Sequence, residues 1–533
     1  MKCQKCGHEN SELDLICSNC GEVLNDTALS MGKKSCPRCG TSFSFGNVCP
    51  NCKYKLKKKS VVKLKKSLIS VLCVVLVVAI VILAVNLAEE KAKINYSAVT
   101  DTSTGCIVVS CGSEILTSEI PGTLSSSLAL TYDSTVCALA SYDLSSGTFG
   151  IYKISTTAVY LIGNSLSSSF CLAADGENIA YTDLSGNLYI GSENNSKEIS
   201  SDVSSYAISP NGKTVIYSDS ENSLYCYNSV GGSVLVGEMF SPVAVSNGGK
   251  YIFAISTEDD RLYLIENKDS SSAEVIASSL TGPVYFNRNN TKMIFTTELG
   301  TYFYEAGSQR RLLFDGFTAQ PCADVTYSLS SSGQYLTLNE KNLTEQYYVL
   351  SSESSSSSAL CYLDSDFAKT TICDDISLYS ISDNKKIVTF LTESDDLYIS
   401  KADDFTNTLI AEDVVSFDAT ITGKYIYYIT SSGEIYQYKN SSQLLASNVS
   451  DVLVSAKGYI FYTSSDGAVL YGANGSDEPV IICESLYRIF MSADSSAVSY
   501  YTLSEQGAYE KYASDGDLDF VLISSNVYYN DIG

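Results

Sequence analysis

A unit of about 40 residues recurs ten times between residue 100 and the C-terminus, and this repeat limits the possible folds more than any other feature of the chain. Each unit has an apolar strand, a turn of small residues, a second strand rich in Ile and Tyr, a polar turn and a third strand with a Tyr. One copy reads "YAISPNGKTVIYSDSENSLYCYN" from Tyr206, and another reads "FDATITGKYIYYITSSGEIYQYKN" from Phe417. The third-strand tyrosines are Tyr152, Tyr189, Tyr225, Tyr263, Tyr302, Tyr347, Tyr398, Tyr436, Tyr471 and Tyr509.

The turn between the first and second strands is a second marker with the same spacing. These turns lie at Asp133-Ser134, Asp175-Gly176, Asn211-Gly212, Gly248-Gly249, Asn289-Asn290, Ser332-Gly333, Asp383-Asn384, Thr422-Gly423, Lys457-Gly458 and Asp494-Ser495. A period near 40 with three or four strands per unit is typical of a β-propeller, whose blades cover one another around a ring. We predict an all-β repeat β-propeller of about ten four-stranded units over residues 100–533, in one large ring or two smaller rings.

The "SPNGK" turn (Ser209–Lys213) followed by an apolar strand resembles the WD-like and TolB-type repeats of bacterial propellers. The Trp-Asp ending of true WD repeats is absent, and the resemblance extends to the blade pattern without any functional residues. The serine run Ser351–Ser358 falls between a third-strand Tyr and the expected fourth strand, so we predict a long hairpin tip inside a blade rather than an interdomain linker.

The N-terminus contains two cysteine modules, which define the predicted domains 1–24 and 33–54. Each has two CxxC motifs, separated by ten residues in the first module and nine in the second. This spacing is typical of a tetrahedral four-thiolate zinc site, and such a short module needs the metal to fold. The eight predicted ligands are Cys3, Cys6, Cys17, Cys20, Cys36, Cys39, Cys49 and Cys52. Disulfide pairing and a rubredoxin-type iron site are the alternatives, and His8 is not expected to be a ligand.

At these cysteines, residues 1–52 resemble the short zinc-ribbon modules that begin many bacterial membrane proteins. The resemblance implies zinc, two ions in all, on the eight cysteines. It also implies contact with a protein or a nucleic acid, without indicating which.

Residues 67–87 are predicted to form a transmembrane helix. From Leu68 to Leu87 the chain reads "LISVLCVVLVVAIVILAVNL" without a charge, and as a helix it would be about 30 Å long, enough to cross a bilayer. The preceding segment, 55–66, is rich in lysine, which favours a cytoplasmic N-terminus and contact with anionic lipid. We therefore expect a single-pass cell-membrane protein with an extracellular C-terminal domain and an uncleaved signal anchor.

The charge is uneven along the chain. Residues 1–87 have 13 Lys and Arg against 5 Asp and Glu, whereas the remaining 446 residues have 22 against 55. The acidic part would repel polyanions, so nucleic acid is not an expected partner. An unknown extracellular ligand or protein and a cytoplasmic protein remain the expected partners.

The large domain offers little for catalysis by familiar hydrolases. The only histidine in the chain is His8, so imidazole-dependent triads and histidine-ligated zinc hydrolases are excluded there. Carboxylate chemistry stays possible, although the acidic residues cluster at the second turns, where tight hairpins favour them. The domain's nine cysteines show no paired spacing, and the repeated tyrosines are expected to pack between strands.

These observations favour a membrane-anchored, non-enzymatic binding, scaffold or sensor protein, with cytoplasmic zinc ribbons and an extracellular propeller. No catalytic or cofactor-binding residue is predicted besides the zinc ligands. The alternative is a surface enzyme of propeller fold that acts on glycans with carboxylates, because glycoside hydrolysis requires no histidine.

Overall fold

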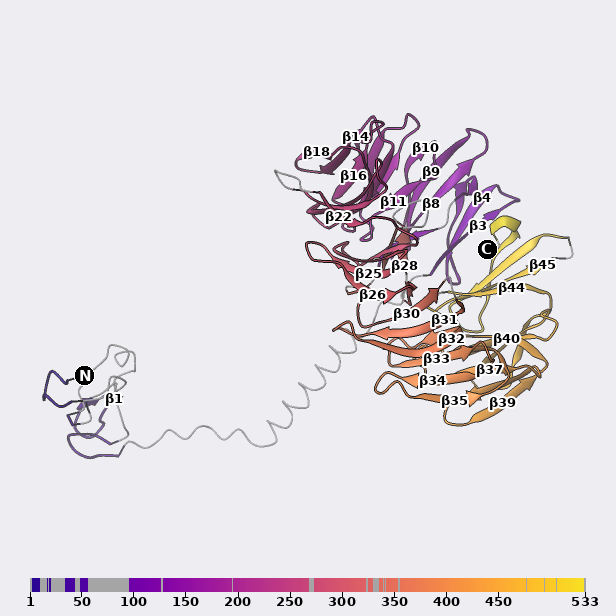
Figure 1. Cartoon of the computed structure of the whole chain (residues 1–533). Coiled ribbons are helices and arrows are strands. Elements are labelled where there is room, and N and C mark those ends of the chain that lie inside the picture. Colours follow the sequence, from indigo (N-terminus) through magenta and orange to yellow (C-terminus); the bar gives the residue numbers. More distant parts are fainter. Residues whose placement is uncertain are drawn as a thin grey trace. The chain divides into compact units, whose positions relative to one another are not determined.

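The computed structural model describes residues 2–9, 17, 19–20, 34–43, 48–55 and 95–531, with gaps at 126–127, 194, 268–272, 323–324, 329–334, 339, 341, 353–354, 476, 493 and 505. The chain divides into two compact units, Met1–Glu90 and Lys91–Gly533 (Figure 1). In the first unit, β1 (Lys34–Ser35) and β2 (Ser42–Phe43) form a short antiparallel pair.

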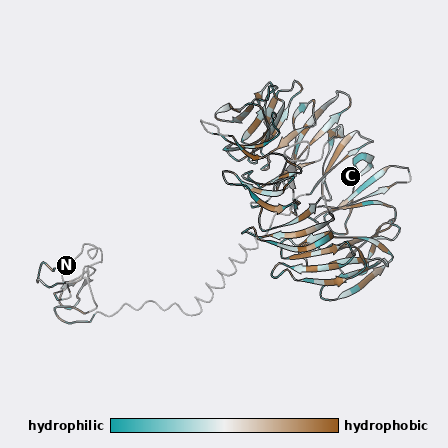
Figure 2. Cartoon of the chain, viewed as in Figure 1, coloured by the Kyte–Doolittle hydropathy of each residue, from teal (hydrophilic) through white to brown (hydrophobic). Residues whose placement is uncertain are grey.

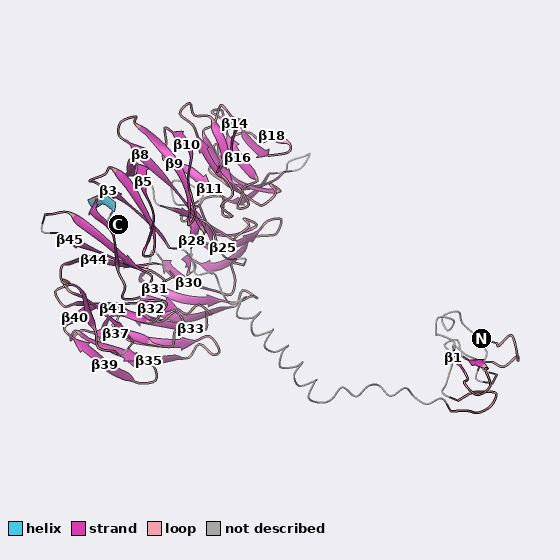
Figure 3. Ribbon diagram, turned by 180° about the vertical axis from the view of Figure 1, so that it is seen from behind, coloured by secondary structure: helices cyan, strands magenta, loops and turns pink. Residues whose placement is uncertain are grey.

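The second unit, here called the β domain, is built from small sheets, in which all described strand pairs but one are antiparallel (Figure 3). Five of them are four-stranded, with the strands in sequence order. They are β11 (Phe170–Leu172), β12 (Ile179–Thr182), β13 (Leu188–Ser192) and β14 (Asn195–Ser200); β15 (Ser205–Ile208), β16 (Thr214–Ser218), β17 (Leu224–Asn228) and β18 (Gly232–Gly237); β19 (Phe240–Val245), β20 (Tyr251–Ser256), β21 (Leu262–Glu266) and β22 (Ala273–Ala277); β36 (Val414–Ala419), β37 (Ile426–Thr430), β38 (Glu434–Tyr438) and β39 (Ser442–Ser447); β40 (Val449–Val454), β41 (Tyr459–Ser464), β42 (Leu470–Asn474) and β43 (Val480–Cys483).

The other sheets of the β domain are larger. One contains β6 (Thr123–Leu124), β7 (Ala129–Leu130), β8 (Val136–Asp143), β9 (Thr148–Ser155) and β10 (Val159–Ser165). A second contains β23 (Val284–Phe286), β24 (Lys292–Thr297), β25 (Gly300–Glu305), β26 (Arg311–Asp315), β28 (Val325–Ser328) and β29 (Tyr335–Leu338). A third contains β27 (Thr318–Pro321), β30 (Gln346–Ser352), β31 (Ser355–Leu363), β32 (Lys369–Ile381), β33 (Ile387–Thr392), β34 (Leu397–Lys401) and β35 (Asn407–Ala411).

The last sheet joins the two ends of the β domain. It combines β44 (Leu486–Met491), β45 (Val498–Leu503), β46 (Tyr509–Ser514) and β47 (Val521–Val527) with β3 (Tyr96–Asp101), β4 (Cys106–Cys111) and β5 (Glu114–Pro121). β3 pairs with β47, and Ser524 donates a hydrogen bond to the carboxylate of Asp101 over 2.9 Å. The short 3-10 helix η2 (Tyr529–Asp531) follows, and the Asp531 carboxylate accepts the Thr100 N–H. The first and last strands of the domain are thereby held together.

The repeated tyrosine packs across the sheet. In seven units a third-strand Tyr stacks on an aromatic residue directly opposite it on the second strand, with ring centroids 5.0–5.8 Å apart. The pairs are Tyr181–Tyr189, Tyr217–Tyr225, Phe295–Tyr302, Phe390–Tyr398, Tyr428–Tyr436, Tyr462–Tyr471 and Tyr500–Tyr512. Such pairs stabilise neighbouring strands. In the last unit, Tyr512 rather than Tyr509 occupies the stacking position.

A β-bulge next to this tyrosine recurs in the fourth strand. Leu224 pairs with Gly237 while Tyr225 pairs with Leu235, so Val236 has no direct partner. The same offset leaves out an apolar residue in six further units, namely Ile199, Ile276, Leu313, Ile410, Leu445 and Ile482. Each of these residues packs in a hydrophobic cluster between sheets, so the bulge turns an extra side chain toward the core.

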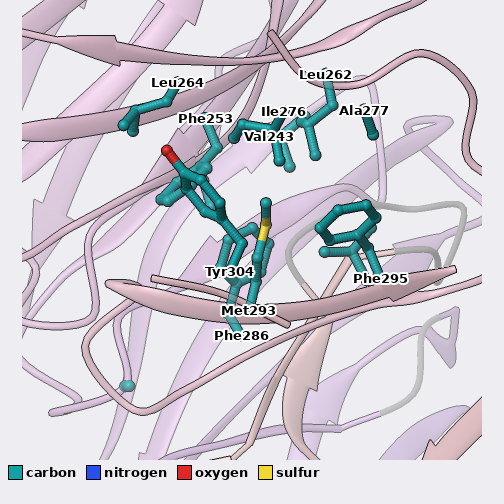
Figure 4. Packing of buried hydrophobic residues seen from close by; sticks show 13 residues of the cluster. Val243, Phe253, Leu262, Leu264, Ile276, Ala277, Phe286, Met293, Phe295 and Tyr304 are labelled. Carbon is teal, nitrogen blue, oxygen red and sulfur yellow. The ribbon is translucent and has the colours of Figure 1, made fainter. Parts of the chain in front are cut away.

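The hydrophobic core lies between successive sheets rather than at one centre, and apolar segments are spread through all of them (Figure 2). Between β19–β22 and β23–β26, Phe253 from one sheet meets Phe286 from the next, with ring centroids 5.1 Å apart at 62° (Figure 4). Met293, Phe295 and Tyr304 complete this layer. Each sheet therefore depends on its neighbours to cover its faces, as in repeat proteins.

The all-β prediction is confirmed. The serine run falls at the hairpin between β30 and β31, but most of its serines belong to these two strands, so the predicted long tip is wrong. β30, which contains Tyr347, follows β27 in the sheet order, so this hairpin joins the second and third strands of its unit rather than the third and fourth. The membrane prediction requires correction. No helix among the residues that the structure describes combines the length and apolar character needed to cross a bilayer. Residues 67–87, where the transmembrane helix was predicted, lie outside the described residues, as does nearly all of 55–66. The predicted single-pass location is therefore unsupported, and we withdraw it.

Candidate metal centres and ring of turns

Three of the four CxxC motifs form the same small hairpin. The N–H of Cys3 donates to the carbonyl of His8, and the N–H of Gly7 donates back to the carbonyl of Cys3, both over 2.9 Å. The same two bonds recur around Cys36, with Thr41 and Gly40, and around Cys49, with Tyr54 and Lys53. The flanking residues pair in an antiparallel manner in each case. Ser35↔Ser42 belongs to the β1–β2 pair, and Lys2↔Glu9 and Val48↔Lys55 are isolated β-bridges.

The residue after the second cysteine turns the backbone into the left-handed region. Gly7 and Gly40 have φ of 73° and 74°, and Lys53 has a φ of 56° at the same position. Glycine adopts this conformation without a steric penalty, whereas a side chain with a Cβ does not. The glycines of the CxxCG motifs are thus explained, and Lys53 is the strained exception.

The sulfur atoms of each module gather at one point. In the first module the Sγ atoms of Cys3 and Cys20 are 3.7 Å apart, and those of Cys6 and Cys17 are 3.5 Å apart. In the second, Cys36–Cys52 and Cys39–Cys49 are both 3.5 Å apart, and all four sulfurs of a module lie within 4.8 Å of one another. Four thiolates placed about 2.3 Å from a tetrahedral zinc would be about 3.8 Å apart.

The donor set therefore fits zinc, and the chain has two four-cysteine zinc sites. The paired sulfurs are 3.5–3.7 Å apart, well beyond the length of a disulfide bond, so their positions fit a shared metal ion better than the disulfide alternative. His8 is outside the ligand group and contributes its backbone carbonyl to the hairpin instead. Four protein ligands leave no coordination position for a substrate, so these are structural sites that hold the modules folded.

The predicted first turns of the β domain share one geometry. In nine of them the fourth turn residue has a positive φ and donates its N–H to the carbonyl of the first. These residues are Ser134, Gly176, Gly212, Gly249, Asn290, Lys385, Gly423, Gly458 and Ser495. The tenth predicted turn, Ser332-Gly333, lies outside the described residues. In several turns a Ser or Thr hydroxyl at the first position also caps a later N–H, as Ser209 does for Thr214 over 3.0 Å.

Five of these turns are joined into a closed ring, which we call the five-turn ring and which comprises the turns at residues 131–134, 173–176, 209–212, 246–249 and 287–290. Hydrogen bonds connect each turn region to the next: Tyr132 N–H to the Ala174 carbonyl, Asp175 N–H to the Pro210 carbonyl, Asn211 N–H to the Asn247 side-chain oxygen, and the Asn290 amide to the Val245 carbonyl. The Tyr132 hydroxyl closes the ring by donating to the Arg288 carbonyl. The same two regions also meet through their strands, because β28, which follows the fifth of these turns in the sequence, contacts β7, which directly precedes the first.

A cavity of about 250 Å³ lies within the five-turn ring. All five turns supply its lining, which consists of Tyr132, Asp175, Pro210, Asn211, Asn247, Arg288 and Asn289. The guanidinium of Arg288 stacks 4.7 Å from the centre of the Tyr132 ring. Desolvation raises the pKa of Asp175 above its usual value, and the charge of Glu177 adds to this rise, while the hydrogen bond from the Glu177 N–H and the charge of Lys213 oppose it.

Asp175 also lines a second cavity, of about 470 Å³. Glu177 and Glu193 place two more carboxylates on its wall. The ammonium of Lys153, whose side chain is 6% exposed, lies 3.2 Å from the Glu193 carboxylate. The acidic wall of this cavity is thus partly neutralised by one buried lysine.

The sequence predicted the zinc ligands and the turns, and it identified no residue as part of a cavity. Tyr132, Arg288 and Lys153 were missed because nothing in the repeat spacing shows which turns meet. Most second-turn acidic residues have the structural role expected of them: Asp219, for example, accepts the N–H groups of Glu221 and Ser223. Every described cysteine of the β domain is a free thiol.

Comparisons with known proteins agree with the N-terminal assignment. Residues 3–53 match the family model of the double zinc ribbon. No curated protein sequence matches the chain. Among solved structures, the chain is similar to the crystal structure of the tricorn protease at 11% identity and a TM-score of 0.27, over 81% of this chain and 62% of that one.

The prediction that the chain is not an enzyme is corrected by this comparison, because the similar structure is that of a protease. We do not retain that prediction. A likeness at this TM-score gives no argument for proteolysis by this chain.

Proposed function

We propose that the chain is a binding or scaffold protein with two binding parts. The zinc ribbons hold a protein partner, and the β domain, folded as a β-propeller, holds a second ligand or partner. The observation that carries the proposal is the pairing of two coordinatively closed zinc sites with a cavity walled by five successive repeat units. A zinc ion with four thiolate ligands has no coordination position for a substrate, so it stabilises the fold of its module, and the module then acts by contacting another protein.

Several features support the propeller as the finer description of the β domain. Successive antiparallel sheets bury their faces against one another, and β3 joins β47 at the two ends of the repeat. The contact between Tyr132 and Arg288 joins units that are four apart in the sequence. We infer that the blades form two smaller rings, one of which includes the five-turn ring.

The partner proposal is tested by cross-linking the full chain and quantifying the captured proteins by mass spectrometry. The double variant Cys6→Ser, Cys39→Ser removes one ligand from each zinc site, and Arg288→Gln is the matched change in the β domain. A partner that is captured by the natural chain and by Arg288→Gln, but not by the cysteine variant, and that binds again as a purified protein supports the proposal. Retention of every partner by the cysteine variant contradicts it.

An enzyme that acts on glycans through carboxylates is the second candidate, favoured by the three acidic residues around the 470 Å³ cavity. Glycoside hydrolysis needs two such groups in suitable positions. If this candidate is right, the full chain hydrolyses at least one member of a glycan panel, and Glu193→Gln or Glu177→Gln abolishes the turnover. Unchanged turnover in both variants would remove it.

A further inference from the structure

The polar groups around the 250 Å³ cavity of the five-turn ring are arranged to donate hydrogen bonds. Three asparagines line the cavity, and each uses its amide oxygen within the turns. Asn211 accepts from the Ser209 hydroxyl over 2.8 Å, Asn247 from the Asn211 N–H over 3.0 Å, and Asn289 from the Thr291 hydroxyl over 2.8 Å. The NH₂ group is the remaining polar end of each amide, and it can only donate.

Arg288 adds a cationic donor whose position is fixed on several sides. Its guanidinium lies 4.7 Å from the Tyr132 ring centre, its carbonyl accepts from the Tyr132 hydroxyl, and its N–H donates to the Glu340 carbonyl over 2.8 Å. A guanidinium stacked on an aromatic ring presents its planar fork in one orientation, and this fork matches both oxygens of a carboxylate.

Asp175 is the one acidic group on the cavity wall. One of its oxygens accepts the Glu177 N–H over 3.1 Å, and its backbone N–H is held by the Pro210 carbonyl over 3.2 Å. The second carboxylate oxygen is therefore suited to accept from a ligand. A cationic or hydroxyl donor on the ligand would satisfy it, whereas a doubly charged phosphate would be repelled.

We propose that this cavity binds a small α-amino acid as its zwitterion. The carboxylate of the ligand lies against Arg288 and the asparagine NH₂ groups, and its ammonium lies against Asp175. A volume of about 250 Å³ is at the small end for ligand pockets, which suits a single amino acid better than an oligosaccharide or a peptide. A neutral sugar has no charge to pair with Arg288 or Asp175, whereas a zwitterion pairs with both.

The proposal rests on the binding function proposed above and names the ligand class of the β domain. Titration calorimetry on the zinc-loaded full chain tests it with glycine, serine and glutamine, each compared with its amine lacking the carboxylate and its acid lacking the ammonium. N-acetylglucosamine and glucose serve as the neutral-sugar arm. We expect at least one amino acid to bind at least ten-fold more tightly than both of its analogues and than either sugar.

The variants assign the two charges separately. Arg288→Lys keeps the positive charge and loses the planar guanidinium, and it is expected to weaken binding of the amino acid at least five-fold. Asp175→Asn is expected to weaken binding of the amino acid at least ten-fold and to leave the affinity for the acid analogue unchanged. Asp383→Asn, a change on a first turn outside the five-turn ring, is expected to leave all affinities as they are. Thermal melting of each variant shows whether its fold is retained.

Binding of a sugar in preference to every amino acid, or no binding of any amino acid at millimolar concentration to the folded natural chain, would overturn the proposal. If Asp175→Asn lost affinity equally for the amino acid and for its acid analogue, the assigned orientation, with the ligand's ammonium against Asp175, would also be overturned. None of these outcomes affects the capture of a partner by the zinc ribbons, so failure here is distinguishable from failure of the proposed function.

Discussion

Lys511 gives the β domain a pH dependence with a predictable sign. Its side chain is fully buried on β46, donates to the Ser97 hydroxyl and has the Asp531 carboxylate nearby. Burial lowers its pKa from 10.5 to about 8, against a smaller opposite effect of Asp531. The charged form is therefore disfavoured by folding, and the unfolded chain binds more protons between these two pKa values.

The magnitude follows from the shift. A difference of about 2.5 pKa units corresponds to about 3 kcal/mol of lost stability below pH 8, and this loss is recovered as the pH rises toward 10.5. Lys511→Met removes this loss, at the cost of about 1 kcal/mol for the hydrogen bond with Ser97, so we expect a net gain of about 2 kcal/mol at pH 7. With an unfolding entropy of about 2 cal/mol/K per residue, that gain raises the Tm of the domain by about 2 °C.

The assay is a series of thermal melts of the full chain between pH 7 and 10.5, for the natural sequence and for Lys511→Met. The difference in Tm should be largest at pH 7 and should shrink steadily above pH 8. Lys213→Met, a change at an exposed lysine, is the control and should give no such trend. A constant difference across the whole range, or a lower Tm of Lys511→Met at pH 7, would refute the reasoning.

Three further predictions concern single residues. Lys53→Gly relieves the left-handed backbone of the fourth CxxC hairpin, so zinc competition with a chelator should show about five-fold tighter binding, corresponding to about 1 kcal/mol. Burial raises the pKa of Asp418 to about 6, so this carboxyl stabilises the fold below pH 4 and loses that contribution as the pH rises to 6. Melts of Asp418→Asn over this range should therefore lack the decline of the natural chain; parallel curves would count against the assignment. Gly423→Ala places a Cβ 2.9 Å from Ile387 at a φ of 67° and should cost about 2 kcal/mol in denaturant unfolding, more than Gly458→Ala, whose Cβ would meet no atom within 4 Å.

The local features of the fold were readable from the sequence because they depend on short-range chemistry. The Asn-Gly and Asp-Gly turns require a positive φ at their last residue, and the CxxCG spacing brings thiolates together around a metal. The repeated Tyr of the third strand and its packing between strands were readable from the sequence, although the stacked cross-strand pair beside a bulge was not.

Contacts between residues far apart in the chain could not be predicted from the sequence, for a physical reason. The contact between Tyr132 and Arg288 depends on small rotations between successive sheets, which no single unit encodes. The cavity in the five-turn ring and its donor-rich lining follow from that contact. The pairing of β3 with β47 likewise joins residues more than 400 positions apart.

The central claim for the N-terminal unit is that it folds around two zinc ions held by eight cysteines. Native mass spectrometry of the full chain, with elemental analysis of the same sample, tests this claim most directly. We predict two zinc ions per chain, one in Cys6→Ser, one in Cys39→Ser and none in the double variant. A single ion in the natural chain, iron in place of zinc, or loss of both ions in either single variant would contradict two independent zinc sites.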